Sequence, residues 1–143
     1  MKTKQVIVFR KDLLKGDKAI RKGKFGAMCA HAAMASLLKF FRKTKCIDND
    51  NNIFTRFELE FGTDCVLEDW LNGLFTKVVV SVPDEQALLD LEQKCIDLDI
   101  PCALIEDAGL TEFHGVPTVT CLGIGPWDSE TLDQQITGDL PLL

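Results

Sequence analysis

The chain has 143 residues, of which 46% are hydrophobic and 27% are charged, and its formal net charge is −6 at pH 7. These proportions are typical of one soluble globular domain, and they exclude an intrinsically disordered chain. No apolar run is long enough to span a membrane, and the N-terminus is too short and strand-like for a signal peptide. We therefore expect a cytoplasmic protein.

The charge is distributed unevenly along the chain. Residues 1–45 contain thirteen lysines and arginines but only two acids, whereas residues 46–143 contain three basic residues and twenty acids. A protein with an acidic total can still bind a polyanion when its positive charge is gathered on one face. The basic N-terminal part is therefore a candidate surface for nucleic acid, and a solvated basic loop is the alternative interpretation.

The cysteines show no spacing that indicates a metal site or a disulfide framework. No CxxC pair occurs, and Cys29 and His31 form only an isolated C-x-H. We expect reduced cysteines that pack in the interior, and no bound metal. The six positions are Cys29, Cys46, Cys65, Cys95, Cys102 and Cys121.

The first half of the chain predicts one strand, one long helix and one short helix. Residues 5–10 are almost continuously apolar, as in a strand that is buried on both faces. Apolar residues recur at helical spacing over 25–44, and the small side chains among them would let this helix approach a sheet closely. Residues 46–54 have the composition of a turn-rich loop, 55–66 show no assignable pattern, and 66–72 predict a short helix.

The second half predicts three strands and two helices, over 76–82, 84–98, 102–105, 118–124 and 128–136. Asp84 and Asp128 stand where an aspartate that caps a helix N-terminus is expected. The order of the main elements is strand, helix, strand, helix, strand, strand, helix. It predicts an α/β fold in a single domain, with a mixed sheet of about four strands and helices on both faces.

Candidate site residues lie where strands of the predicted sheet end. In open α/β sheets, sites form at the carboxyl ends of strands and in the loops that follow them. The basic loop follows the first strand and Asp107 follows the third, so Lys22 and Asp107 would face each other if these strands are neighbours. Lys22 and Lys24 also precede the first helix, whose free N–H groups favour a phosphate. His31 shares a helical face with apolar residues, which by itself is more typical of a packed histidine.

Several catalytic motifs are missing from the sequence. There is no GxSxG nucleophile elbow, no Walker A pattern and no HExxH zinc motif. The stretch GIGP at 123–126 lacks the GxGxxG frame and is more typical of a turn after a strand. These absences argue against the serine hydrolases, nucleotide-binding proteins and zinc hydrolases that use those motifs.

Six segments, taken in order, are similar to a known family. They are KQVIVFRKDL, KGKFGAMCAHAA, KVVVSVPDEQALLDL, ALIEDAGLTEF, VTCLGIGP and ITGDLPLL. Together they resemble the type 2 peptidyl-tRNA hydrolases, which are typical of archaea and eukaryotes. The resemblance extends over residues 1–143 as one domain, apart from an expected insertion at roughly 45–70.

The resemblance implies an activity and a set of site residues. Members of this family have a mixed sheet flanked by helices, commonly form homodimers, hydrolyse the ester that joins a peptide to tRNA, and need no metal or organic cofactor. The residues to which the resemblance gives a catalytic role are Lys22, Asp107, Thr111 and Thr120. His31 matches the histidine of the family's first helix, and we expect it to bind substrate together with Lys24.

Two positions depart from the family pattern. Met28 stands where family members often carry glutamine, and Glu106 stands where they usually carry a basic residue. A second carboxylate beside Asp107 would repel phosphate and tend to raise the pKa of Asp107, which favours its use as a general base. The first alternative is therefore a diverged, non-catalytic relative that binds tRNA or a protein partner. The second alternative is a hydrolase that acts on a different small ester or amide.

Overall fold

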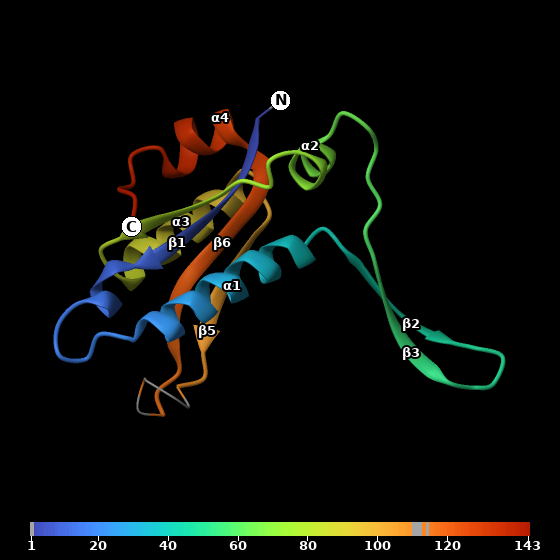
Figure 1. The fold of residues 1–143 in the computed structure, drawn as a ribbon, viewed down its shortest axis with the longest axis horizontal. Helices are drawn as coiled ribbons and strands as arrows, with labels where there is room; N and C mark the ends of the chain where they lie inside the picture. Colours follow the sequence, from blue (N-terminus) through green and yellow to red (C-terminus); the bar gives the residue numbers. More distant parts are fainter. Residues whose placement is uncertain (1, 110–112, 114) are drawn as a thin grey trace.

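A computed structural model describes residues 2–109, 113 and 115–143, and Figure 1 shows the arrangement of its helices and strands. In chain order they are β1 (Thr3–Arg10), the 3-10 helix η1 (Lys11–Leu14), α1 (Lys22–Leu38), β2 (Arg42–Ile47), β3 (Ile53–Glu58), α2 (Val66–Asn72), β4 (Lys77–Val82), α3 (Glu85–Asp97), β5 (Cys102–Asp107), β6 (Thr118–Asp128), α4 (Ser129–Leu132) and the π-helical turn η2 (Asp133–Thr137).

The main sheet has four strands in the order β4-β1-β6-β5. β1 is parallel to β4 and antiparallel to β6, and β6 is antiparallel to β5. This arrangement confirms the predicted single α/β domain with a mixed sheet of about four strands. β1 and β5 are not neighbours, because β6 lies between them, so the basic loop and Asp107 do not leave adjacent strands.

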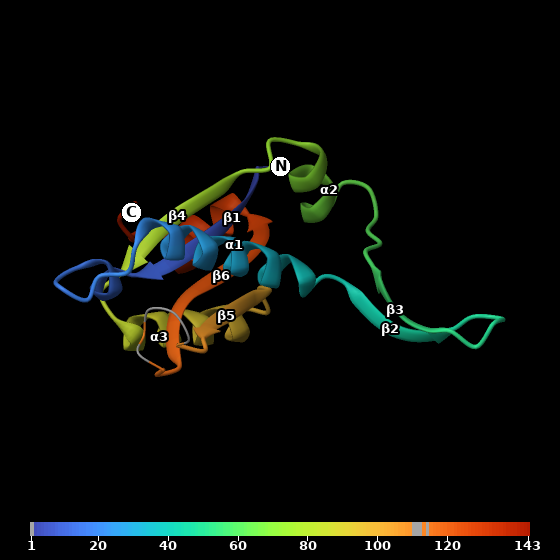
Figure 2. The same cartoon turned by 60° about the horizontal axis from the view of Figure 1, so that its bottom comes forward.

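Helices cover both faces of this sheet, as predicted (Figures 1 and 2). β1 contributes to both layers: Val6 and Val8 pack in the core that contains α3, whereas Ile7 and Phe9 pack in the core that contains α1. All four side chains are at most 3% exposed. The unbroken apolar run in this strand therefore follows from its burial on both faces.

The position of α1 over the sheet depends on Gly123 in β6. A Cβ at position 123 would overlap the backbone carbonyl of Ala32 in α1. One turn further along α1, the buried Ser36 hydroxyl donates a hydrogen bond to the backbone oxygen of Gly125. These two contacts hold α1 directly against β6, which is the close approach expected from the small side chains of this helix.

The main difference from the predicted elements lies after α1. The helix predicted over 25–44 spans Lys22–Leu38, and the predicted loop at 46–54 belongs to a hairpin formed by β2 and β3. The turn-forming residues of this region occupy only the hairpin tip, where the Asp48 carboxylate accepts hydrogen bonds from the backbone N–H groups of Asp50 and Asn52. Residues 42–45, which are basic or polar, belong to β2 and not to the helix.

Most other boundaries agree with the predicted ones. α2 covers the predicted residues, and Asp84 caps α3 by accepting a hydrogen bond of 3.0 Å from the Ala87 N–H. β6 continues to Asp128, whose carboxylate caps the short α4, and η2 replaces the second half of the predicted last helix. In the described part of the chain, no helix combines the length and apolarity that crossing a membrane requires.

Candidate active site

Asp107 is the last residue of β5, and a glycine turn holds its carboxylate. The N–H of Gly109 donates to Oδ1 of Asp107 at 2.8 Å. Gly109 has φ +82°, and a Cβ at this position would overlap the backbone of Val116, so only glycine fits the turn. The small residues after Asp107 therefore orient the carboxylate at the end of the strand.

The cation that binds Asp107 is Lys24, in the first turn of α1. Its Nζ donates to Oδ2 of Asp107 at 2.6 Å, and the two side chains are only 15% and 11% exposed. Lys22 was expected to face Asp107 if the first and third strands were neighbours, and β1 and β5 are not. Lys22 is instead exposed at the first position of α1, without a hydrogen bond or ion pair to any other residue that the structure describes.

The surroundings of Asp107 stabilise its ionised form. The hydrogen bond from Lys24 is the largest cause that lowers the pKa of Asp107 below its usual value, and the Gly109 N–H and the charges of Lys24 and His31 act in the same direction against burial. The expected rise of this pKa through Glu106 is not found, because the causes that lower the pKa of Asp107 outweigh burial, which raises it. Glu106 is exposed, and the cation beside Asp107 outweighs burial.

Thr120 lies beneath this pair in β6 and is fully buried. Its hydroxyl lies 3.3 Å from the backbone oxygen of Ile105 in β5 and 3.6 Å from the Met28 sulfur in α1. Thr120 thus connects the strand that carries Asp107 to the helix that carries Lys24. Thr111, the other threonine predicted at the site, lies outside the described residues.

His31 and Met28 lie on the face of α1 that carries Lys24. Positions 24, 28 and 31 are three or four residues apart, which places their side chains on one side of a helix. His31 is exposed, and its charge contributes to the low pKa of Asp107, so it belongs to the same site. Lys22 and Lys24 lie in the same turn of α1, so no local signal in the sequence identifies Lys24 as the partner of Asp107.

A basic segment lies beside the N-terminus of α1. η1 and the loop that follows it reach α1 through Ile20, which is buried and whose N–H donates to the Leu13 oxygen. The cations of this segment are exposed, and so is Lys22 at the start of the helix. An anion that approaches Asp107 would therefore meet positive charge and the free N–H groups of α1. The exposed cations of the segment are Lys11, Lys15, Lys18 and Arg21.

All six cysteines are free thiols and form no disulfide. Within the residues that the structure describes, no group of three or more His, Cys, Asp or Glu side chains is arranged to hold a metal ion. The chemistry that the described site offers consists of a carboxylate, a cation bound to it, a second exposed lysine and a nearby histidine.

Comparison with known proteins gives a consistent result over the whole chain. The family model described as "Peptidyl-tRNA hydrolase PTH2" matches residues 3–143. A protein of Sulfurisphaera tokodaii named peptidyl-tRNA hydrolase is 38% identical over 143 residues, which are 100% of both chains. Proteins of the same name from Methanopyrus kandleri and Saccharolobus solfataricus are 38% and 36% identical over 140 residues, covering 98% of this chain and 97% and 98% of their own. The chain belongs to the PTH2 family of peptidyl-tRNA hydrolases.

Proposed function

We propose that this protein is a peptidyl-tRNA hydrolase, which cleaves the ester between a peptide and the terminal ribose of tRNA. The Lys24–Asp107 pair beside the N-terminus of α1 is the observation that carries the proposal. It combines an oriented carboxylate with positive charge at an edge of the molecule that attracts anions. The full-length match to the family supports the same reaction.

Ester hydrolysis requires an oriented water and stabilisation of the charge that develops on oxygen. Because the ionised form of Asp107 is favoured, its carboxylate accepts a hydrogen bond from the attacking water and orients it. The water oxygen bonds to the ester carbonyl carbon and the bond from that carbon to the ribose oxygen breaks. One proton of the water reaches the leaving oxygen, and the other is released to solvent as the acid ionises. The products are a peptide carboxylate and a tRNA with a free hydroxyl group.

Lys24 and Lys22 have different electrostatic roles at this site. Lys24 keeps Asp107 ionised and in place. Lys22, which is exposed and lies two residues before Lys24 in α1, stabilises the developing oxyanion or the leaving group. His31 contacts the substrate from the same helix face, and Thr111 binds the water or the terminal adenosine. The buried hydroxyl of Thr120 supports a positioning role through β5 and α1, and its predicted catalytic role stays a prediction.

The exposed cations of the 11–24 segment contact tRNA phosphates. Such contacts release counterions, so affinity depends strongly on salt and little on tRNA sequence. Because its substrate arises in translation, the enzyme works in the cytoplasm. The active form is a homodimer, as in other members of the family. The interpretation of residues 45–70 as an insertion into the family domain stays a prediction.

The test is release of tRNA from peptidyl-tRNA by the purified protein, with EDTA present and absent. The Asp107→Asn variant keeps the shape of the side chain but loses its charge, and it should reduce turnover by at least about 100-fold. Glu106→Gln, which neutralises the exposed neighbouring carboxylate, is the matched control and should retain turnover.

Full activity of Asp107→Asn would contradict the assignment of the site. Salt-dependent tRNA binding by a folded wild-type protein without any turnover would contradict hydrolysis and select the non-catalytic relative. Turnover that disappears with EDTA and returns with added metal would contradict the metal-independent reaction.

A further inference from the structure

Two cysteine side chains, Cys95 and Cys102, lie together in the core between α3 and β5. Cys95 is in the last turn of α3 and is fully buried. Cys102 is the first residue of β5 and packs against the core cluster that contains Cys95. The Cys95 thiol donates a hydrogen bond to the Cys102 sulfur. The two sulfur atoms are therefore direct neighbours in the folded chain.

A tight turn fixes the two cysteines relative to each other. The backbone oxygen of Cys95 accepts a hydrogen bond of 2.8 Å from the Ile100 N–H, and the Pro101 oxygen accepts one of 2.8 Å from the N–H of Gly125 in β6. Asp99, with φ +55°, turns the chain at the end of α3. Because the backbone between the two cysteines is held at both ends, a bond between their side chains would close only this short turn.

Of the two thiols, Cys102 is the one that solvent reaches. It is partly exposed and lines a surface groove of about 560 Å³ between α1, α3 and β5, whereas Cys95 is 0% exposed. Lys39 at the end of α1 and Glu92 in α3 contribute charged side chains to this groove. A dissolved oxidant would therefore meet the Cys102 sulfur first, and Cys95 could react only through Cys102.

The surroundings of Cys102 favour its thiolate. The hydrogen bond from Cys95 is the largest cause that lowers the pKa of Cys102 below its usual value, and the charge of Lys39 acts in the same direction against burial and the charge of Glu92. The same hydrogen bond and burial raise the pKa of Cys95, so the proton stays on Cys95. The thiolate is the nucleophilic form of cysteine. A low-pKa, accessible cysteine beside a second thiol is the arrangement that redox-sensitive pairs use.

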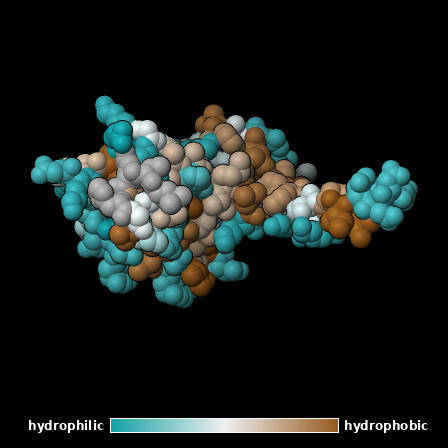
Figure 3. Space-filling model, turned by 90° about the horizontal axis from the view of Figure 1, so that it is seen from below, coloured by the Kyte–Doolittle hydropathy of each residue, from teal (hydrophilic) through white to brown (hydrophobic). Residues whose placement is uncertain are grey.

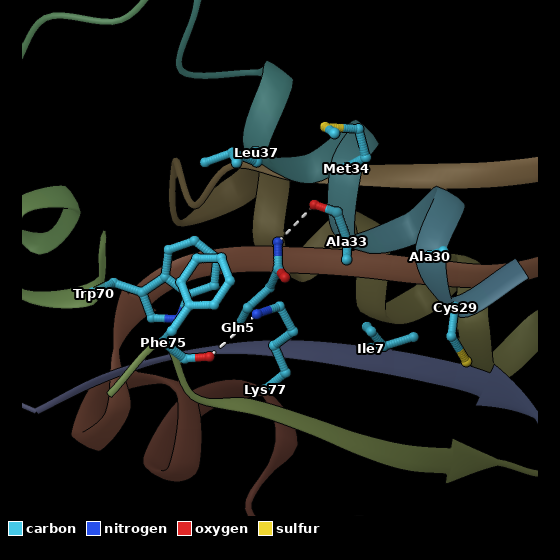
Figure 4. Close-up of a pocket in the computed structure, with 10 residues that line it drawn as sticks. All are labelled: Gln5, Ile7, Cys29, Ala30, Ala33, Met34, Leu37, Trp70, Phe75 and Lys77. Atoms are coloured by element: carbon cyan, nitrogen blue, oxygen red, sulfur yellow. Dashed lines mark hydrogen bonds between the residues drawn. The ribbon is translucent and has the colours of Figure 1, made fainter. Parts of the chain in front are cut away.

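Two other cysteines are held in the thiol form by burial. Cys29 lies in the wall of an apolar pocket formed by β1, α1, α2 and the start of β4 (Figure 4), and burial raises its pKa to about 11. Cys121 is buried in β6, and its pKa is raised to about 12, mainly by burial. Both side chains are therefore poor nucleophiles near neutral pH.

The remaining two cysteines are partly exposed, but their neighbours are not thiols. Cys46 lies in the β2–β3 hairpin, residues 42–58, which forms an arm that projects beyond the C-terminal end of α1 (Figures 1 and 3). Its sulfur is 3.8 Å from the Thr44 hydroxyl. Cys65 donates to the backbone oxygen of Gly62 at 3.1 Å. An oxidised Cys46 or Cys65 would therefore face a hydroxyl or a carbonyl group, neither of which can form a disulfide.

We propose that Cys102 and Cys95 form a peroxide-sensitive thiol pair, in which Cys102 is oxidised first and Cys95 then converts it to a disulfide. The Cys102 thiolate attacks one oxygen of hydrogen peroxide, the O–O bond breaks, and the leaving hydroxide takes up the proton that Cys102 released. The Cys95 sulfur then attacks the sulfenic acid on Cys102, the S–O bond breaks, and the departing hydroxide leaves as water with the Cys95 proton. The two thiols lose two electrons and two protons, and one peroxide becomes two waters.

This modification site is separate from the candidate active site. Cys102 is the first residue of β5, and Asp107 is the last. Neither step of the oxidation uses Lys24 or Asp107, and the disulfide would join the start of the strand to α3. The inference therefore does not rest on the proposed hydrolysis.

Peptide mapping of the reduced protein after treatment with hydrogen peroxide tests the pair. Remaining thiols are alkylated, and the chain is cleaved at Asp97 or Asp99, which lie between the two cysteines. The expected product is a peptide with Cys95 joined to a peptide with Cys102, with two hydrogen atoms fewer than the reduced pair. Cys102 should be consumed at least about tenfold faster than the buried Cys29, since the thiolate fraction falls about tenfold for each unit by which the pKa rises.

Two variants test the order of the steps. In Cys95→Ala, the reaction should stop at a sulfenic acid on Cys102, which a 1,3-diketone reagent labels. In Cys102→Ala, Cys95 should stay a thiol because it is buried. Cys46→Ala is the matched control, since Cys46 is partly exposed like Cys102 and its removal should leave formation of the disulfide unchanged.

The wild-type protein decides the proposal even if a variant does not fold. A disulfide that joins other cysteines, or a Cys102 that reacts no faster than Cys29, would overturn it. So would oxidation of Cys95 in a folded Cys102→Ala protein at the rate at which wild-type Cys102 reacts, because Cys95 would then not depend on Cys102.

Discussion

Replacing Gly123 by alanine tests how closely α1 must lie against the sheet. The added Cβ would overlap the carbonyl group of Ala32 and would lie 3.0 Å from the Cβ of Ser36. The first of these neighbours is backbone, so α1 has to move away from β6 by roughly an ångström. Inserting a methyl group into a well-packed interior costs about 1–3 kcal/mol, and a chain of this size loses roughly 3 °C in Tm for each kcal/mol.

Urea unfolding of Gly123→Ala measures this cost directly. Gly26→Ala is the matched control, because Gly26 lies in α1 with no heavy atom near the position of an added Cβ. That substitution should stabilise the protein by about 0.5–1 kcal/mol, since alanine favours the helix more than glycine does. The movement of α1 in Gly123→Ala should also displace Lys24 from Asp107 and reduce turnover. A Gly123→Ala protein that is as stable as Gly26→Ala would refute the close approach of α1 to β6.

Three further predictions follow from the site. Because the pKa of Asp107 is lowered in the folded protein, its ionised form contributes stability that is fully present above the unfolded value of about 3.9. The stability difference between wild type and Asp107→Asn should therefore be largest near neutral pH and disappear as the pH falls through the folded-state pKa, which urea unfolding at several pH values measures. Thr120→Val keeps the shape of the side chain but removes the hydrogen bond to Ile105, so it should lower the free energy of unfolding by about 0.5–1.5 kcal/mol; an unchanged stability would contradict that contact. Lys18→Ala should reduce the slope of log affinity against log salt by about 0.7–0.9 if Lys18 contacts one phosphate, and an unchanged slope in tRNA-binding measurements would exclude that contact.

The elements of the central fold could be predicted from the sequence because burial determines their patterns. The run from Val6 to Phe9 is apolar at every position, since β1 is covered on both faces. Asp84 marks the start of α3 through a local hydrogen bond that needs no tertiary contact. The β2–β3 arm was missed for the opposite reason. Its strands are not buried against the body, so no pattern of burial distinguishes them, and the turn residues at the tip obscure the strands on either side.

The site could be predicted only in part, for a related reason. Asp107 follows an apolar strand and precedes a glycine that the turn requires, so its position depends on local sequence. Which lysine binds it depends on how α1 is rotated and placed over the sheet. Lys22 and Lys24 both lie in the first turn of α1, and the contact of that helix with Gly123 helps to set its placement. Tertiary packing therefore decides between the two lysines.

The long connection between β1 and β4 explains how the chain accommodates the arm. These two parallel strands are joined by a crossover that contains η1, α1, the arm and α2. The entropy lost on closing such a connection grows only with the logarithm of its length, so removing residues 42–58 would change it by about 0.3 kcal/mol. Because the arm begins and ends near the C-terminal end of α1, its presence has almost no effect on the pairing of β1 with β4. This part of the chain can be lengthened, shortened or exchanged while the sheet that positions Asp107 stays the same.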